Sequence, residues 1–431
     1  MSRPGNSTMT SSSSQQQMMH HRQSSGSSNG HRNGHQQAAP ALAPPPEMME
    51  QMNFQRTMRE LSAYLDNFQY PYINDVSHYE KLLKIGQGTF GEVFKARCKK
   101  TGKLVALKKI LMENEKEGFP ITALREVKML QQLKHKNITE IIEVCSSNRD
   151  SIRDKTTFYI VFAFCEHDLA GLLKNRNVRL QPVHIKTMMK HLLEGLMKLH
   201  KVQILHRDMK AANVLISKEG YLKLADFGLA RPFIKSSPPA SYTNRVVTLW
   251  YRPPELLLGE RQYTTKIDVW GAGCIMAEMW TRLPIMQGDT EQNQLLNISR
   301  LCGSINRECW PTVEKLPYFS QMELPQGHPR ILVKKLGEVI KDDCALALID
   351  KLLTMDPSNR FEAEEAIYHD WFFKDPRPNA NVEDLMKTIK ESHFELTVAR
   401  GGPHTNRPKP ANNQRSQQNN LPAGQYRDTI F

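Results

Sequence analysis

The string HRDMKAAN, at residues 206–213, carries a carboxylate, an ammonium group and an amide at short spacing. Asp208 can accept the proton of a substrate hydroxyl, Lys210 can neutralise phosphate charge, and Asn213 can bind Mg²⁺. A second carboxylate, Asp226, follows an apolar run and can hold the same ion, because Mg²⁺ takes one or two protein oxygens and completes its shell with water and phosphate. These residues indicate phosphoryl-transfer chemistry.

Upstream, the string GQGTFGEV at residues 86–93 lies between two strand-like segments. Glycine lacks a Cβ, so this backbone can approach phosphates closely, although a glycine-rich hairpin turn explains the string as well. The segment after the string has strand character, which excludes a dinucleotide-binding loop. Lys108 lies in the next apolar strand and needs a phosphate or carboxylate partner, unless it faces water on an edge strand. Glu126, in the helical segment after it, is the natural carboxylate.

The elements that must position these groups change character along the chain. Strand-like segments come first, with one helical segment among them, and mostly helical segments follow, which predicts an α+β fold of two lobes. We expect a small β-rich N-lobe at residues 79–163 and a larger helical C-lobe at residues 168–373. The expected strands are residues 79–85, 92–96, 105–110 and 158–162, and the expected helices are residues 123–133, 183–200, 268–280 and 344–353.

In this order, the motifs resemble the signature set of eukaryotic protein kinases. The resemblance covers residues 72–373 and implies a two-lobed kinase fold. It also implies that Glu255 pairs with a late arginine, here Arg360, and that Asp268 lies in a buried helix supporting the catalytic loop. The matching elements are residues 86–93, Lys108, Glu126, residues 206–213, residues 226–228 (DFG) and residues 253–255 (PPE), in which Pro253 replaces a more usual alanine.

The resemblance implies ATP and Mg²⁺ as cofactors. The implied catalytic residues are Asp208, Lys210, Lys108 and Glu126, and the implied metal ligands are Asn213 and Asp226. Adenine would bind backbone groups at positions 163 and 165, and Asp168 would face the ribose. The full set expected to contact the nucleotide is Ile85, Gly86, Gln87, Gly88, Thr89, Phe90, Gly91, Glu92, Val93, Ala106, Lys108, Phe162, Ala163, Phe164, Cys165, Asp168, Asn213, Leu215 and Asp226.

The string PITALRE at residues 120–126 resembles the cyclin-contacting helix of cyclin-dependent kinases, in its transcriptional members. This implies an ATP-dependent serine/threonine kinase that is activated by a cyclin of the transcriptional class (T- or K-type). Residues 246–252 resemble the family's proline-directed pocket. Such a pocket selects proline after the target residue, because proline lacks the N–H that the pocket would leave unpaired. The implied substrate is the RNA polymerase II C-terminal domain, the implied process transcription elongation, and the implied location the nucleus.

Regulation can be read from the segment between Asp226 and Glu255. Thr243 lies there in a polar loop, and a phosphate on it would bring nearly two negative charges. The arginines that could bind this phosphate are Arg125, Arg207 and Arg231. Cell-cycle relatives carry an inhibitory Thr-Tyr pair in the glycine loop, whereas this chain has Thr89-Phe90, so tyrosine phosphorylation is excluded there.

The chain has 431 residues, of which 39% are hydrophobic, and 58 Lys/Arg against 45 Asp/Glu give a net charge of +13. We find no run of ~18 apolar residues and expect no membrane contact. Seven cysteines occur singly, which argues against disulfides and zinc modules and favours a reducing, intracellular compartment. Residues 1–53 and most of 374–431 are expected to be disordered tails. Residues 54–78 form a linker with a short amphipathic helix, which could dock on the domain or on a partner.

Three other interpretations remain. The first is that the chain resembles a different member of the transcriptional cyclin-dependent kinases, and Leu124 in the string at residues 120–126 disfavours this interpretation. A catalytically dead scaffold would have lost Lys108, Asp208 or Asp226, all of which are present. The net charge of +13 suggests nucleic acid, but no basic-aromatic motif accompanies it, so we expect no direct nucleic-acid binding.

Overall fold

The computed structural model describes residues 73–88, 91–111, 121–147, 157–233 and 241–396. All of them belong to one unit of the chain, Tyr70–Phe431. The predicted disordered N-terminal tail, the amphipathic helix, Thr89 and Phe90 lie outside the described residues.

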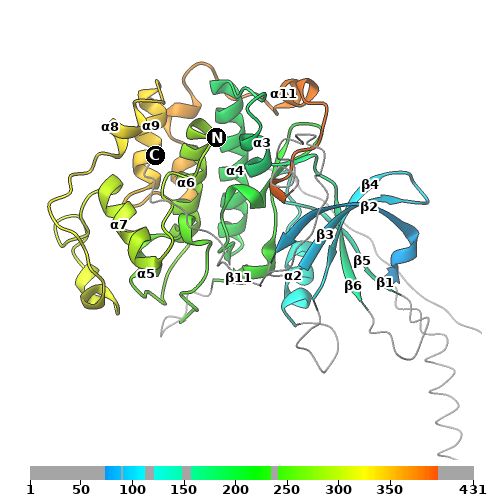
Figure 1. The fold of residues 1–431 in the computed structure, drawn as a ribbon, viewed down its shortest axis with the longest axis horizontal. Helices are drawn as coiled ribbons and strands as arrows, with labels where there is room; N and C mark the ends of the chain where they lie inside the picture. Colours follow the sequence, from blue (N-terminus) through cyan, green and yellow to red (C-terminus); the bar gives the residue numbers. More distant parts are fainter. Residues whose placement is uncertain (1–72, 89–90, 112–120, 148–156, 234–240, 397–431) are drawn as a thin grey trace, which may run out of the picture. The chain divides into compact units, whose positions relative to one another are not determined.

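The N-lobe is a six-stranded sheet with one helix (Figure 1). Its strand order is β1-β5-β6-β4-β3-β2, in which β1 and β5 are parallel and the other pairs antiparallel. All four predicted strands and the predicted helix are present. The elements are β1 (Ile73–Asp75), β2 (Tyr79–Gly88), β3 (Gly91–Cys98), β4 (Leu104–Lys109), α2 (Ile121–Gln132), β5 (Ile141–Ser146) and β6 (Phe158–Ala163).

Side chains of β4 alternate between the two faces of the sheet, so that one face packs in the core of the lobe and the other lines the cavity. Successive side chains of a strand point to opposite faces. Val105 and Leu107 are buried with Tyr159 and Val161 in the core of the lobe. Ala106 and Lys108 therefore point the other way, toward the cavity between the lobes.

The C-lobe packs around helix α6 (Lys266–Thr281), which is buried along almost its whole length. A helix that is apolar all round is typical of a protein interior. Around it lie α4 (Pro182–Lys201), α7 (Glu291–Cys302) and α9 (Asp343–Leu352). The shorter elements are α3 (Leu169–Lys174), α5 (Pro254–Leu257), α8 (Leu332–Leu336), α10 (Ala363–Ile367), α11 (Glu383–Thr388), β7 (His167–Asp168), β8 (Ile204–Leu205), β9 (Val214–Ile216), β10 (Leu222–Leu224) and β11 (Arg231–Pro232).

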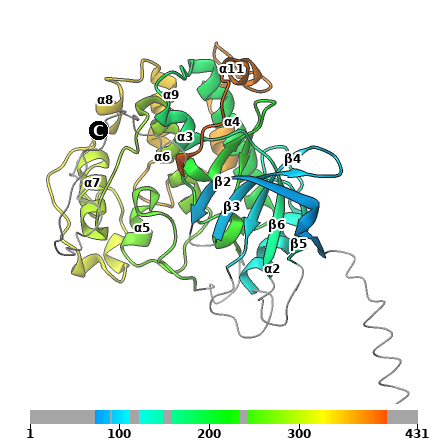
Figure 2. The ribbon, with the colours of Figure 1, turned by 45° about the vertical axis from the view of Figure 1, so that its right-hand side comes forward.

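The chain beyond the predicted domain boundary at residue 373 is part of the fold up to residue 396. Val382, Leu385 and Met386 are buried in the C-lobe core at α11. From α11 the segment runs back to the lobe junction (Figure 2), where the carbonyl of His393 accepts from the Asp168 N–H at 3.1 Å. The predicted start of the C-terminal tail, residue 374, is therefore too early. A few apolar side chains in this polar stretch suffice to anchor residues up to 396 on the C-lobe. None of the described helices is long and apolar enough to span a membrane.

Candidate active site between the lobes

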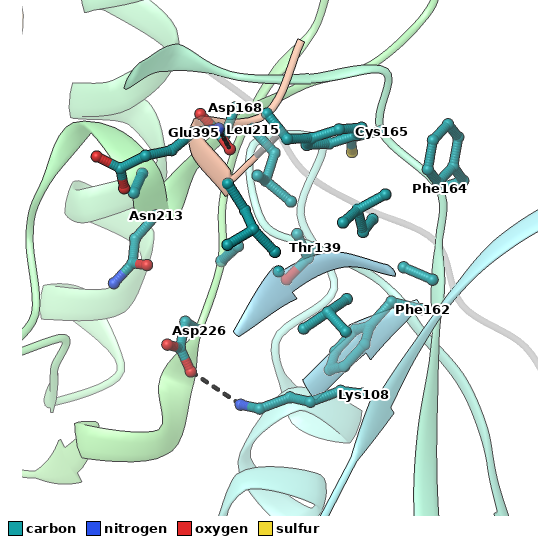
Figure 3. A pocket seen from close by; sticks show the side chains of 18 of the residues that line it. Lys108, Thr139, Phe162, Phe164, Cys165, Asp168, Asn213, Leu215, Asp226 and Glu395 are labelled. Atoms are coloured by element: carbon teal, nitrogen blue, oxygen red, sulfur yellow. Dashed lines mark hydrogen bonds and ion pairs between the residues drawn. The ribbon is translucent and has the colours of Figure 1, made fainter. Parts of the chain in front are cut away.

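The two lobes enclose a cavity of about 270 Å³ (Figure 3). Strands β2, β3 and β4 line it on one side, and the residues after β8 and β10 line it on the other. Lys108 and Asp226 face each other across it. The predicted nucleotide-contacting residues found in its wall are Ile85, Gly86, Gln87, Gly91, Val93, Ala106, Lys108, Phe162, Ala163, Phe164, Cys165, Asp168, Asn213, Leu215 and Asp226.

One further described residue of the predicted set, Glu92, is not in the wall. Gly88 pairs with Gly91 at the tip of the β2–β3 hairpin. Glu92 alternates with Val93 along β3 and so points to the other face of the sheet, where it forms ion pairs with Lys84 and Lys109.

The glycine loop needs a glycine at one position for a geometric reason. Gly91 has φ +138°, a conformation that other residues rarely adopt. A Cβ added there would lie 1.9 Å from the carbonyl oxygen of Lys109. The close approach of β3 to β4 beside the cavity therefore depends on this glycine.

Lys108 lies between two carboxylates. Its Nζ donates to Glu126 Oε1 and Oε2 at 2.8 and 3.1 Å and to Asp226 Oδ1 at 2.8 Å. Burial disfavours the charged lysine, but the attraction of Asp226 and Glu126 outweighs it and raises the pKa of Lys108. Burial likewise opposes ionisation of Asp226, and Lys108 lowers the pKa of Asp226 below its usual value. This part of the site thus holds the Lys108 ammonium group and an ionised aspartate.

Asp226 has a left-handed backbone, with φ 60° and ψ 75°. Such a conformation is uncommon outside glycine and often marks functional sites. Its neighbours hold it in place: His206 Nε2 donates to the Ala225 carbonyl at 3.0 Å, and the Ala225 N–H donates to the Asn213 carbonyl at 2.9 Å. The His206 ring also contacts Phe227 edge-on, at 5.0 Å between centroids.

The carboxylate of Asp208 accepts three side-chain hydrogen bonds. Lys210 Nζ and Asn213 Nδ2 both donate to Oδ2 at 2.8 Å, and Thr248 Oγ1 donates to Oδ1 at 3.0 Å. Asp208 is buried, whereas Lys210 lines the cavity. A substrate hydroxyl that replaced Thr248 as donor would therefore meet a base with an ammonium group beside it.

As expected, Asp268 of α6 supports the catalytic loop, residues 206–213, through hydrogen bonds to its backbone. Its two oxygens accept the N–H groups of His206 and Arg207, both at 2.9 Å, and a hydrogen bond from His200 Nε2 at 3.0 Å. Burial opposes the charge of Asp268, but the His200 hydrogen bond and the surrounding donors lower its pKa. Arg207 has φ 65°, so this strained turn is held by two charge-assisted hydrogen bonds.

The donor set fits a hard divalent cation. Asn213 Nδ2 is used by Asp208, which leaves the amide oxygen as the atom that can bind a cation, and Asp226 supplies a carboxylate kept ionised by Lys108. Carboxylate and amide oxygens are the ligands that Mg²⁺ prefers. Asn213 and Asp226 line the same cavity (Figure 3).

The far end of the cavity contains residues that the sequence patterns did not identify. Phe394, Glu395 and Leu396 of the C-terminal segment line it, and the Glu395 N–H donates to Asp168 Oδ2 at 2.9 Å. The remaining unpredicted residues of the wall are Thr139, Ala212 and Ala225. Ala225 directly precedes Asp226 and could have been inferred, whereas no signal in the sequence ties residue 139 or residues 394–396 to this cavity.

Asp168 lies at the end of the cavity that residues 394–396 line. Its Oδ1 accepts the Gly171 N–H at 2.6 Å and so caps helix α3. Burial raises the pKa of Asp168 to about 7, although the N–H groups of Gly171 and Glu395 act in the opposite direction. This carboxyl group therefore changes charge near neutral pH.

Of the predicted arginines, Arg207 contacts the segment between Asp226 and Glu255, here called the activation segment, and Arg231 lies within it. Arg207 donates to the Leu229 carbonyl at 2.7 Å and to Tyr263 Oη at 3.0 Å, and Tyr263 Oη donates to the Thr243 carbonyl at 2.7 Å. Arg231 stacks on the ring of Tyr242, 5.0 Å from its centroid. Arg125 and the Thr243 side chain are exposed, on α2 and on the loop respectively.

Val247, in the same segment, has φ 67°. Its carbonyl accepts from Arg252 Nη2 at 3.0 Å and Nε at 3.3 Å, and Arg252 is in turn paired with Glu291 at 2.7 Å. The Val247 carbonyl is thus already engaged by the Arg252 guanidinium.

Glu255 and Arg360 form the expected pair. Arg360 Nη1 and Nη2 donate to Glu255 at 2.6 and 2.9 Å, and both side chains are almost fully buried. The Arg360 guanidinium also lies over the Trp270 ring, at 4.9 Å. This bidentate pair ties the end of the activation segment to α6 and to the loop before α10.

Comparison with known proteins agrees with this geometry. Residues 79–372 match the Protein kinase domain family. A Caenorhabditis elegans protein named as a probable cyclin-dependent kinase 9 is 60% identical over 86% of this chain and 87% of its own length. Human cyclin-dependent kinase 9 is 58% identical over 77% and 89%. A chain in the crystal structure of the yeast RNA Pol II CTD kinase CTDK-1 complex is 38% identical, with TM-score 0.64 over 72% of this chain and 98% of that one.

Proposed function

The chain belongs to the protein kinase family, in its cyclin-dependent kinase 9 group, and from this premise we propose that it phosphorylates Ser/Thr-Pro repeats of the RNA polymerase II C-terminal domain during transcription elongation. It is a serine/threonine kinase that uses ATP. The observation that carries the proposal is the joint geometry of Lys108, Asp226 and Asp208: an ammonium and a metal-binding carboxylate at one end of the cavity, and a hydrogen-bonded base beside it.

The roles of the site residues follow from their contacts. Asp208 accepts the proton of the substrate hydroxyl, and Lys210, 2.8 Å from it, neutralises charge on the transferred phosphoryl group. Lys108, fixed by Glu126, binds the phosphates of ATP. Asn213 and Asp226 hold Mg²⁺, which when bound supplies charge neutralisation for the phosphates. Hydrophobic residues of the wall bind the adenine, with Ala163 and Cys165 at the backbone positions.

Proline specificity is supported by Val247 and Arg252. A substrate residue that follows the target would normally seek an acceptor for its N–H. Because the Val247 carbonyl is bound to Arg252, this N–H would be left unpaired. Proline has no N–H and avoids that cost. A Ser-Pro or Thr-Pro substrate, such as the polymerase C-terminal domain named for the yeast relative, meets this condition.

Activation by a T- or K-type cyclin on α2 and by phosphorylation of Thr243 belongs to the same proposal. Glu126 lies on α2, so any partner that moves α2 moves the Lys108 pair. A phosphate on the exposed Thr243 can recruit Arg207, Arg231 and Arg125. The proposed location, the nucleus, follows from the substrate.

The test is phosphate transfer from ATP to a Tyr-Ser-Pro-Thr-Ser-Pro-Ser repeat peptide, with and without a cyclin of the transcriptional class. We expect transfer that depends on the cyclin, disappears in Asp226→Asn and falls sharply when alanine replaces the prolines. Absence of transfer with every such cyclin, despite phosphorylated Thr243, would reject the proposal.

A further inference from the structure

A second cavity, of about 620 Å³, is lined by parts of two elements that also position active-site residues, α2 and β10. The end of α2, the loop to β5 and strand β10 line it, and we call it the α2–β5 groove. Helix α2 contributes Glu126 to the active site and Leu130 to the groove, and β10 leads from Lys223 in the groove to Asp226 in the active site. The groove is therefore attached to the catalytic elements without sharing their residues.

The rim of the groove is cationic. Lys134, Lys136 and Lys223 line it, and Lys198 of α4 is close enough to act on its His135. Two acids oppose them: Glu140 lines the groove, and Glu194 pairs with Lys136 at 2.9 Å. Four lysines against two glutamates leave an excess of positive charge. Burial lowers the pKa of His135; Glu194 opposes this shift and the lysines add to it.

The floor of the groove is apolar. Leu133 and Ile138 are buried, and Ile141 is partly exposed. Among the described residues that line it there is no Phe, Tyr or Trp on which a nucleic-acid base could stack. A cationic rim over an aliphatic floor suits a peptide that alternates anionic groups with an apolar side chain.

We propose that the α2–β5 groove binds phosphorylated Ser-Pro repeats, the product of the proposed kinase reaction; the inference rests on that proposed function. Each phosphate adds close to two negative charges, so a repeat gains affinity for the lysine rim only after it has been phosphorylated. The repeat's tyrosine supplies the apolar side chain for the floor. Binding of finished repeats holds the rest of a repetitive substrate near the active site.

The experiment measures fluorescence anisotropy of a labelled four-repeat peptide, unphosphorylated or phosphorylated on serine. The full chain is used with its cyclin, and the active site is saturated with a non-hydrolysable ATP analogue and a short unlabelled Ser-Pro peptide. The test variant is Lys134→Glu/Lys198→Glu, in which Lys134 is exposed and Lys198 half-buried, with the milder Lys134→Gln/Lys198→Gln beside it. The matched control is Lys315→Glu/Lys334→Glu, two exposed lysines, of which Lys334 lies on α8 (Figure 1).

We expect the phosphorylated peptide to bind about tenfold tighter than the unphosphorylated one, and the test variant, but not the control, to lose about that factor in a salt-dependent way. Phosphorylation of a single-site peptide should be unchanged in both. Equal binding of the two peptides, or equal loss in test variant and control, would overturn the proposal. Loss of affinity for a 40-nucleotide RNA instead would assign the groove to nucleic acid. Tight, variant-sensitive binding supports the groove even if wild-type phosphate transfer fails, a result that would count against the proposed function alone.

Discussion

Lys108 on β4 and Glu126 on α2 form a two-point contact, at 2.8 and 3.1 Å, between the only α-helix described in the N-lobe and its sheet. The same Nζ reaches Asp226 of the other lobe at 2.8 Å. One ammonium group therefore couples the position of α2 to the metal-binding aspartate. Neighbouring Lys109, on the opposite face of β4, has no part in this and pairs with Glu92 at 3.6 Å.

The first prediction is that Lys108→Met lowers kcat/KM for peptide phosphorylation by at least about 10²-fold, because it removes the charge that binds the phosphates of ATP. It should also lower the free energy of unfolding by about 3 kcal/mol, since Glu126 is left buried and unpaired. Lys109→Met is the control and should leave both quantities near wild type. Steady-state kinetics and urea denaturation measure them, and equal effects of the two substitutions would contradict the assignment.

A second prediction concerns Tyr263, whose hydroxyl links Arg207 to the Thr243 carbonyl. Tyr263→Phe removes this link, which should cost about 1 kcal/mol, or about fivefold in kcat/KM, in the enzyme with unphosphorylated Thr243. Once Thr243 carries a phosphate, Arg207 can bind it directly, so the effect should shrink. Kinetics of both phosphorylation states test this, with Tyr221→Phe as the control. An undiminished effect after phosphorylation would show that Tyr263 acts elsewhere.

Much of this architecture could be predicted because its signal is local. The helices predicted at residues 183–200, 268–280 and 344–353 lie within two residues of their observed ends, since each shows a continuous helical pattern of apolar residues. The wall of the cavity was largely anticipated from motifs, and the Glu255–Arg360 pair, 105 residues apart, from family resemblance.

The features that escaped prediction depend on tertiary contacts. Glu92 was assigned to the nucleotide because it lies in the glycine motif, yet strand alternation turns it to Lys84 and Lys109. The segment up to residue 396 has the composition of a tail, and its order comes from contacts with residues more than 200 positions away, such as Asp168. Thr139 reaches the cavity wall through the bridge of Ile138 to Leu224, which no local pattern encodes.

The third prediction tests that C-terminal segment. A Cβ added at Gly171 of α3 would lie 2.6 to 2.8 Å from the backbone of Phe394. Gly171→Ala should therefore displace residues 393–396 from the cavity while the helix itself gains about 0.5–1 kcal/mol. We expect faster proteolysis after residue 390 and an altered KM for ATP, without loss of thermal stability. Truncation after Ser392 should reproduce the KM. A Gly171→Ala enzyme that is as protected as wild type would refute the contact.

The fourth prediction follows from two buried carboxyl groups. Burial raises the pKa of both Asp168 and Glu278 to about 7; Tyr251, which donates to Glu278 at 2.7 Å, opposes the shift at Glu278. An unfolded chain releases these protons near pH ~4. Between pH ~4 and ~7 the native state thus holds two protons that the unfolded state lacks, so stability falls as pH rises through this window.

Asp168→Asn and Glu278→Gln should each flatten that dependence by about one proton, and the double variant by about two. The groups differ in place: Asp168 lines the cavity, whereas Glu278 lies on α6 outside it. Only Asp168→Asn should therefore change how the KM for ATP varies between pH ~6 and ~8. Chemical denaturation at a series of pH values gives the proton count, and kinetics over the same range give the KM. If stability depends on pH in the same way in wild type and Asp168→Asn, Asp168 is ionised throughout this range. If Glu278→Gln alters how the KM for ATP varies with pH, the titrating group lies in α6.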